Sequence, residues 1–370
     1  MFAGIGWYLS ARWHRGLISF FPKLRRWPVI LFVVALFLLL IFGFVRSFLP
    51  VSSGVKQVLG QLSGYGMGIF LYLLLFTLAA DILLLAPRLM KLPFVTHRLF
   101  NGCALAGILL LTAATCTYGF INGRQIDHVS YEIRMENKND ISDLNMVLIS
   151  DLHLGAIGSE ERLGEIVDEI NSLHPDVVCV AGDFFDTDFA SIGDPEAAIK
   201  TLRKLQSTYG VYTSLGNHDG GQTHGQMLAF LEQADIQLLD DTYTVIDDRL
   251  VLVGRLDGSS IGGYDGRQRK EFAEVYTEKD SKLPVIVLDH NPAYVEEYGP
   301  EADLILCGHT HKGQVFPGSL ITGLMYPVDY GYYRADAESP QVVVTSGIGY
   351  WGLPMRVGTN SEIVTLKFCK

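Results

Sequence analysis

Five apolar runs of the chain are each followed closely by aspartate, asparagine or histidine. In chain order these residues are Asp151 and His153 after "NMVLIS", Asp183 after "DVVCVAG", Asn217, His218 and Asp219 after "GVYTSLG", His290 after "PVIVL", and His309 and His311 after "ADLILCG". Taken singly, an aspartate at such a place is usually a turn residue or a helix cap. Taken together, imidazole and carboxylate groups are the ligand set that binds first-row divalent metals. The pattern therefore predicts a metal site.

The number of these residues indicates more than one ion. Seven of them are expected to be metal ligands: Asp151, His153, Asp183, Asn217, His290, His309 and His311. A single ion with an open position would use fewer ligands, whereas two ions that share a bridging carboxylate would use all seven. Two ions about 3.5 to 4 Å apart are the recurrent arrangement for hydrolysing phosphate esters, because they stabilise the attacking and leaving oxygens together. The count favours phosphoester hydrolysis.

Strand and helix patterns alternate beyond residue 140, which is typical of an α/β domain. Residues 160–173, 195–208 and about 226–233 have helical patterns, and residues 243–257 are predicted to form a hairpin that turns at Asp247 and Asp248. In open α/β sheets, ligands bind where the loops at the carboxyl ends of the strands converge. Asp151 and His153 are one residue apart, and alternate residues leaving a strand point to the same side. Both can therefore reach one ion.

The first third of the chain has the composition of a membrane region. Residues 27–45, 57–80 and 99–123 lack charge over lengths close to the roughly 20 apolar residues that a span needs. A cleaved signal peptide would explain only one such run. Residues 1–21 mix aromatic and basic side chains, which suits an interfacial helix. We interpret Asp81, a few residues before the basic loop at Arg88, as an interfacial anchor.

Charge is distributed unevenly along the chain. The first 124 residues carry 11 of the 29 lysines and arginines and one acid, which leaves 18 basic residues and 39 of the 40 acids for residues 125–370. Basic residues precede the first predicted span and follow the second, so the N-terminus is expected inside and residue 124 onward outside. The acidic second part argues against binding nucleic acid. We therefore expect an integral cell-membrane protein with an extracytoplasmic catalytic domain and no nucleic-acid partner.

The motifs "DLH", "GDFFD", "GNHD", "DHNP" and "GHTH", in that order, resemble the calcineurin-like metallophosphoesterase superfamily over roughly residues 144–368. The longer stretches "GHTHKGQ" and "TSGIGYWGLPMRVG" are similar to its membrane-attached bacterial branch. The resemblance implies an α/β fold, a four-layer αββα sandwich of two packed sheets flanked by helices. Here an all-α transmembrane region precedes the sandwich.

The resemblance also implies a role for each site residue. Asp151, His153 and His311 would hold the first metal, Asn217, His290 and His309 the second, and Asp183 would bridge the two. His218 would contact the phosphate and assist the leaving group, and Asp219 would orient His218. The expected cofactors are two divalent metal ions, with manganese, iron, zinc and nickel all compatible with these ligands.

These inferences divide the chain into four parts. They are an interfacial or truncated membrane segment (1–26), a transmembrane region of three helices (27–123), a linker with the first strand (124–143) and the metallophosphoesterase catalytic domain (144–370). The predicted function is membrane-anchored hydrolysis of a phosphoester or pyrophosphate, in a phosphorylated small molecule such as a nucleotide sugar or in a lipid-linked substrate. The alternative is a non-catalytic membrane-interaction or transport-associated protein that retains the fold.

Two aromatic, glycine-containing stretches, residues 321–333 and 347–355, have two interpretations. They could form an apolar rim that holds a lipid substrate. The plainer interpretation is that they pack against the sheet or the membrane helices.

Overall fold

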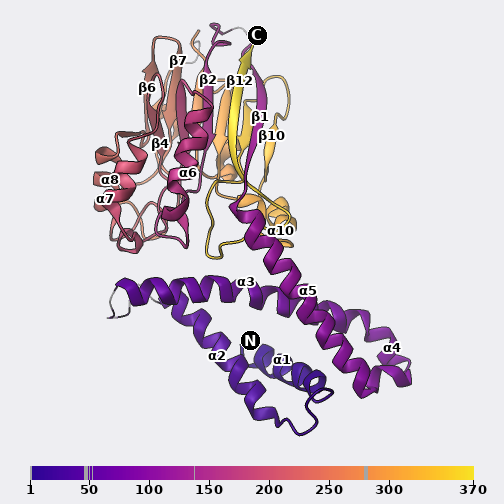
Figure 1. Ribbon diagram of the computed structural model, residues 1–370. Helices are drawn as coiled ribbons and strands as arrows, with labels where there is room; N and C mark the ends of the chain where they lie inside the picture. The colour runs from indigo at the N-terminus through magenta and orange to yellow at the C-terminus, as the bar shows by residue number, and fades with distance from the viewer. Residues whose placement is uncertain (1, 46–48, 50, 52, 137, 279–281) are drawn as a thin grey trace. The chain divides into compact units, whose positions relative to one another are not determined.

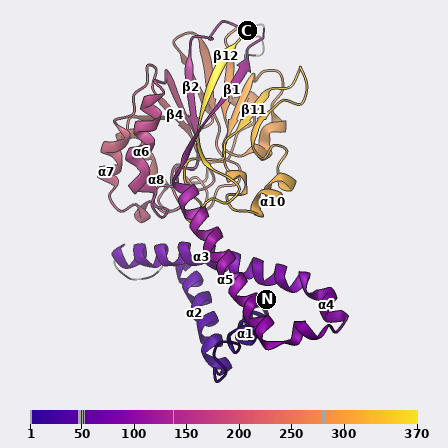
Figure 2. The same ribbon diagram turned by 45° about the vertical axis from the view of Figure 1, so that its right-hand side comes forward.

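A computed structural model describes residues 2–45, 49, 51, 53–136, 138–278 and 282–370 (Figures 1 and 2). The chain divides into two compact units, Met1–Ile121 and Asn122–Lys370. The described part of the first unit is helical, and the second contains the strands.

The first unit consists of helices, of which three are long and apolar enough to cross a membrane. Its elements are α1 (Phe2–Leu17), α2 (Arg26–Val45), α3 (Ser53–Leu83), α4 (Leu85–Leu89), η2 (Pro93–Thr96) and α5 (Arg98–Arg124), the last of which ends in the second unit. The apolar stretches are Arg26–Gly43, Val58–Leu83 and Arg98–Arg124, close to the three predicted spans. The helices agree with a membrane-associated chain.

Asp81 lies at the centre of a polar cluster within this unit. Its Oδ1 accepts from Arg12 Nε at 2.8 Å and from Arg88 Nη2 at 2.9 Å, and its Oδ2 accepts from the Tyr8 hydroxyl at 2.9 Å. The Trp13 indole N–H donates to Thr77 Oγ1 at 3.2 Å. The cluster thus joins α1 and α4 to the end of α3.

Two six-stranded sheets form the second unit. The first has the order β1 (Ile126–Arg134), β12 (Ser361–Cys369), β2 (Asn145–Ile149), β3 (Val177–Ala181), β4 (Val211–Ser214) and β5 (Ile236–Leu238). The second has the order β10 (Gly331–Tyr333), β11 (Gln341–Val344), β9 (Leu304–Cys307), β8 (Val285–Leu288), β7 (Leu250–Gly254) and β6 (Thr242–Ile246). Strands β2 to β5 are mutually parallel, as are β7, β8, β9 and β11.

The sheets pack face to face and helices cover their outer faces. Successive side chains of a strand point to opposite faces, so Met146 and Leu148 of β2 enter the core between the sheets, whereas Val147 and Ile149 enter the core beneath the helices. Burial on both faces explains why the predicted strands are continuous apolar runs. The four layers match the fold expected from the sequence.

Helices and turns complete these layers. They are α6 (Ser159–Ser172), η3 (Phe189–Ser191), α7 (Pro195–Leu202) and α8 (His224–Gln233) on the first sheet's side, followed along the chain by α9 (Phe272–Val275), η4 (Pro292–Glu297), η5 (His311–Gly313) and α10 (Gly318–Met325). The hairpin between β6 and β7 turns at Asp247 and Asp248, both with positive φ, as predicted.

The helix α7 is shorter than the pattern over residues 195–208 predicted. It ends at Leu202. The backbone that follows is hydrogen-bonded by the side chain of Asn171, near the end of α6. The Asn171 side chain donates to the Lys204 carbonyl at 2.8 Å and accepts the Gln206 N–H at 2.8 Å. These hydrogen bonds with Asn171 take the place of those that a further turn of α7 would form.

Candidate metal centre

The loops that leave β2, β3 and β9 hold site residues in an uncommon backbone conformation. Positive φ angles occur at Asp151 (56°), His153 (48°), Asp183 (50°), His309 (71°) and His311 (49°). Side chains other than glycine adopt this region rarely, at a cost of about 1–3 kcal/mol each, and such strain gathers at functional sites. Five strained residues among the seven predicted ligands therefore indicate that the fold maintains their directions for a function.

Glycines at the strand ends allow these loops to approach closely. A Cβ added to Gly216 would lie 2.3 Å from both the backbone nitrogen and Oδ1 of Asp183, and one added to Gly308 would lie 2.5 Å from Asp151 Oδ2. Any larger side chain would displace the carboxylates. The glycines of "LGNHD" and "CGHTH" thus make room for the acids of the site.

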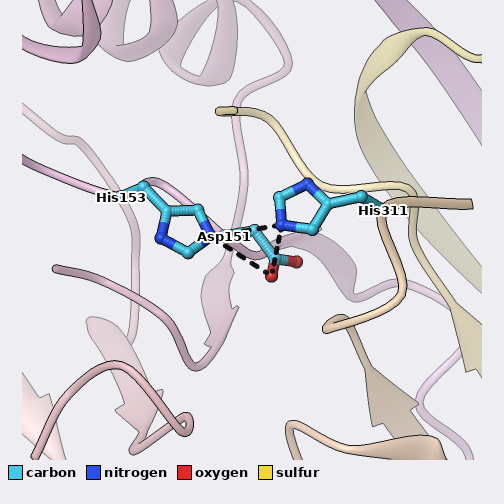
Figure 3. A group of neighbouring side chains, drawn as sticks. All are labelled: Asp151, His153 and His311. Carbon is cyan, nitrogen blue, oxygen red and sulfur yellow. Dashed lines mark hydrogen bonds and ion pairs between the residues drawn. The ribbon is translucent and has the colours of Figure 1, made fainter. Parts of the chain in front are cut away.

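Three predicted ligands form a first cluster, which comprises Asp151, His153 and His311 (Figure 3). The Nε2 atoms of His153 and His311 are 3.1 Å apart. Asp151 Oδ1 lies 3.3 Å from His311 Nε2 and 3.9 Å from His153 Nε2. One carboxylate oxygen and two imidazole nitrogens therefore converge within the reach of a single ion.

Three further ligands form a second cluster, which comprises Asn217, His290 and His309. Asn217 Oδ1 lies 2.7 Å from His309 Nδ1 and 3.2 Å from His290 Nε2. His290 Nε2 and His309 Nδ1 are 3.1 Å apart. His290 uses its other ring nitrogen, Nδ1, for a 2.8 Å contact with the Ala181 carbonyl, which leaves Nε2 facing the cluster.

Asp183 faces both clusters with the same oxygen. Its Oδ2 is 3.2 Å from His290 Nε2 and 3.8 Å from His153 Nε2. The other oxygen, Oδ1, accepts the backbone N–H of His218 at 2.8 Å, which fixes the carboxylate plane. One oxygen of Asp183 is therefore close to a histidine nitrogen of each cluster.

The pKa shifts of four predicted ligands favour the protonation states that metals bind, whereas those of Asp151 and His290 run the other way. Burial raises the pKa of Asp151 to about 6. Burial opposes a charge on His290, but the carboxylates, chiefly Asp183, outweigh it and raise the pKa of His290 well above its usual value. Burial, the largest cause, lowers the pKa of His153 and of His309 to about 3, and it lowers the pKa of His311 well below the usual value. Burial is the largest single effect and acts against ionisation of Asp183, but the charge and hydrogen bond of His290 together with two neighbouring histidines outweigh it and hold the pKa of Asp183 well below its usual range. Neutral imidazole and charged carboxylate are the forms that coordinate metals. The donor set and its convergence fit two divalent ions.

His218 lies beside the first cluster, with its ring centroid 5.0 Å from that of His153. The atom next to His218 Nδ1 is Thr187 Oγ1, at 2.5 Å. The two carboxylate oxygens of Asp219 instead accept the backbone N–H groups of Phe185 at 2.9 Å and Gly216 at 2.8 Å. In the described contacts, Asp219 therefore ties together the loops after β3 and β4, and Thr187 is the residue placed to orient His218.

Burial and the negative charge of Asp183 raise the pKa of Asp219 to about 7. Two backbone donors point at its oxygens, so its hydrogen bonds favour the ionised form that burial opposes. Within the described residues, the hydrogen bonds of the Asp219 carboxylate are with the loops, and its action on His218 stays a prediction.

Several residues that support the site carry no motif that singles them out. The Tyr326 hydroxyl lies 2.9 Å from His309 Nε2, although the sequence suggested only an apolar role for its stretch. Arg356 is fully buried and donates to the carbonyls of Ser346, Gly347 and Gly349, which shape the loop beside Asp151. In the sequence, Arg356 is distinguished only as the single charged residue of the apolar run "LPMRV".

The aromatic stretches have mixed positions. Tyr350 is buried and its hydroxyl donates to the Gly123 carbonyl, which supports packing. Trp351 is 52% exposed, and its ring centroid lies 6.4 Å from that of His218. Of Tyr350 and Trp351, only Trp351 is exposed enough to form part of a rim.

Comparisons with known proteins agree with this geometry. Residues 144–313 match the family model of calcineurin-like phosphoesterases. A "transmembrane protein with metallophosphoesterase domain" from Danio rerio is 30% identical over 361 residues, which cover 92% of this chain and 80% of the relative. An "uncharacterized metallophosphoesterase" from Helicobacter pylori is 31% identical over 231 residues, which cover 61% of this chain and 60% of the relative, less than two thirds of its length.

Among solved structures, Haemophilus influenzae NAD nucleotidase is 17% identical with a TM-score of 0.35, over 55% of this chain and 45% of its own. The family assignment does not depend on that likeness. The sequence relatives, the matched motifs and the two-sheet fold together show that this membrane-associated chain belongs to the calcineurin-like metallophosphoesterases, a family of phosphoric ester hydrolases.

Proposed function

We propose that the protein is a membrane-anchored phosphoesterase that uses two divalent metal ions to cleave a phosphoester or pyrophosphate bond. The observation that carries the proposal is the position of Asp183, whose Oδ2 faces both ligand clusters. One cluster would hold each ion: Asp151, His153 and His311 the first, and Asn217, His290 and His309 the second. Two such ions supply Lewis acidity that lowers the pKa of water and neutralises charge on the phosphoryl oxygens.

His218 is proposed as the residue that protonates or hydrogen-bonds the leaving oxygen. Thr187 Oγ1 lies next to Nδ1, so Nε2 is the ring nitrogen available to a substrate. General acid catalysis of this kind contributes about 10²- to 10⁴-fold to a rate. Asp219 holds the loops of Asp183 and Asn217 in place by accepting backbone N–H groups of Phe185 and Gly216.

We further propose that the catalytic unit is extracytoplasmic. The support is the distribution of basic residues, which precede the first span and follow the second. The substrate would be a phosphorylated small molecule, for example a nucleotide sugar, or a phosphorylated lipid. Membrane attachment favours the lipid because it keeps the site near the bilayer surface.

A metal-refilling assay tests the enzyme proposal. The full chain, purified in detergent, is stripped of metal and refilled with manganese, iron, zinc or nickel, and is then given monoester, diester, pyrophosphate and lipid-phosphate substrates. We expect hydrolysis of at least one class, with two ions bound per chain. Absence of hydrolysis with every metal would favour the non-catalytic alternative.

The matched pair of variants for this assay is Asp183→Asn and Asp235→Asn. Both exchange a carboxylate for an amide, but the Asp235 side chain is 74% exposed and outside the site. Only the first should lose activity and bound metal.

A further inference from the structure

The strand directions place the metal centre at the end of the second unit where the chain leaves the membrane. The strand β1 begins at Ile126, two residues after the apolar helix α5 ends at Arg124. Since β1 is parallel to β12 and β12 is antiparallel to β2, the carboxyl end of β2 lies where β1 begins. Asp151, just beyond β2, is therefore at the end of the sandwich that follows the span.

Side-chain bonds attach the end of the span to the same region. Asn122 Nδ2 donates to the Thr359 carbonyl at 2.9 Å, and Ser361 Oγ donates to the Gly123 carbonyl at 3.2 Å. Gly349 precedes Thr359 by ten residues in the chain, and its backbone N–H donates to the Asp151 carbonyl at 3.0 Å. The loop before β12 thus connects the span's last turn to the metal centre.

The helix α10 lies at this end of the second unit in both views (Figures 1 and 2), and its exposed side chains are apolar. We define the α10 face as Phe316, Leu320, Ile321, Leu324 and Met325, which are 48%, 60%, 58%, 90% and 65% exposed. Residues 316–326 contain no charged side chain. An exposed apolar face of this kind marks an interaction surface.

The α10 face is linked to both the membrane side and the catalytic side. The backbone N–H of Phe316 donates to the Val357 carbonyl at 2.8 Å, in the loop that holds Asn122. At the other end of the helix, the Tyr326 hydroxyl lies 2.9 Å from His309 Nε2. The segment therefore extends from the span's attachment point to a proposed metal ligand.

We propose that the α10 face docks into the surface of the lipid bilayer and presents the metal centre to phosphate groups carried by membrane lipids. The bilayer is the occupant that the structure favours, because covalent connection to the span keeps this end of the unit at the membrane. Docking is driven by apolar burial, since the segment carries no charge to attract anionic lipid. The substrate part of this inference rests on the proposed phosphoesterase function, whereas the docking part does not.

A depth measurement tests docking independently of activity. Serine replaces Cys103 and Cys369, the cysteines that are not buried, and a nitrobenzoxadiazole probe is attached at Leu324→Cys or at Val245→Cys in the full chain. Val245 is 43% exposed and pairs with Val251 near the start of β7, at the opposite end of the sheet. In phosphatidylcholine nanodiscs with doxyl-labelled lipid, the probe at 324 should be quenched and the probe at 245 should not. Equal quenching at both positions would overturn docking.

Paired substrates test the lipid specificity. Phosphatidic acid in nanodiscs is compared with glycerol 3-phosphate, and phosphatidylglycerol with its deacylated diester. The variant Leu320→Ser with Leu324→Ser should lower cleavage of the lipid roughly tenfold, because part of the apolar burial is lost, and should leave the soluble partner unchanged. The control Tyr243→Ser with Val245→Ser should change neither.

The outcomes separate the two proposals. Equal effects of the α10 variant on lipid and soluble substrates would overturn the lipid specificity. If wild-type protein cleaved none of the substrates, the proposed function would fail, while quenching at 324 would still support docking.

Discussion

The two ligand clusters differ in the charge that they contribute. The first has its own carboxylate, Asp151, together with two imidazoles, whereas the second has the neutral amide of Asn217 with two imidazoles. The negative charge nearest to the second cluster is that of Asp183, whose Oδ2 is 3.2 Å from His290 Nε2. A site with fewer charged ligands binds a divalent ion more weakly. The first cluster is therefore expected to bind its ion more tightly than the second.

The clusters also differ in their surroundings. Asp151 and His153 are fully buried, while His309 is only partly buried and has the Tyr326 hydroxyl as its neighbour. The second cluster is thus nearer to the open side and to α10. We infer that the first cluster holds its ion firmly, whereas the second, with its partly exposed ligand His309, holds its ion less tightly.

Loss of Asp183 should have the largest effect because this residue faces both clusters. We expect Asp183→Asn to remove at least one ion per chain and to lower turnover by about 10³-fold or more, since several kcal/mol of charge stabilisation are lost. Metal analysis and initial rates measure the two effects. An Asp183→Asn protein with two ions and wild-type turnover would contradict the bridging role.

Separate substitutions in the two clusters should reveal their unequal affinities. Asp151→Asn removes the charge of the first cluster, and we expect it to lower metal content from two ions to one and turnover by about 10²- to 10³-fold. In wild-type protein, stepwise chelation should release two ions in two phases. The variant should lack the slower phase. Release of both ions in one phase from wild-type protein would show that the clusters do not differ as proposed.

His218→Asn tests a residue that belongs to neither cluster. Turnover should fall by about 10²-fold, because the group that protonates the leaving oxygen is lost, while metal content stays at the wild-type value. The fall should be smaller for substrates with acidic leaving groups such as p-nitrophenol, which need no proton. A fall that is the same for all leaving groups would assign His218 to phosphate binding alone.

The sequence predicted the fold well where burial is two-sided. The runs at β3, β8 and β9 are apolar throughout, and the run at β2 is apolar from Met146 on, because both faces of each sheet are covered. The end of α7 was not predictable, since it depends on Asn171, a residue about thirty positions away that binds the Gln206 N–H. Patterns within one segment carry no information about such contacts.

The candidate site likewise contains residues that could be predicted from the sequence and residues that could not. Its seven proposed ligands could be named because they follow apolar runs and because their types suit metals, and the structure brings them into two clusters around Asp183. The contacts of Thr187, Asp219 and Tyr326 could not be named in advance. They depend on loop conformations, including the positive φ of Thr187 (64°), that arise only when both sheets are assembled.

Tyr326→Phe should have the smallest effect and should act on the second cluster alone. The substitution removes the hydroxyl beside His309 Nε2 and keeps the ring. Loss of a contact that orients a ligand histidine typically lowers metal affinity by about 10- to 100-fold, and we expect the lower end because His309 also faces Asn217 at 2.7 Å. Turnover at saturating metal should remain near the wild-type value, whereas turnover at limiting metal should fall. The matched control is Tyr332→Phe, whose hydroxyl contacts Gln341 instead of a site residue. Equal metal dependence of the two variants would show that Tyr326 has no part in holding the second ion.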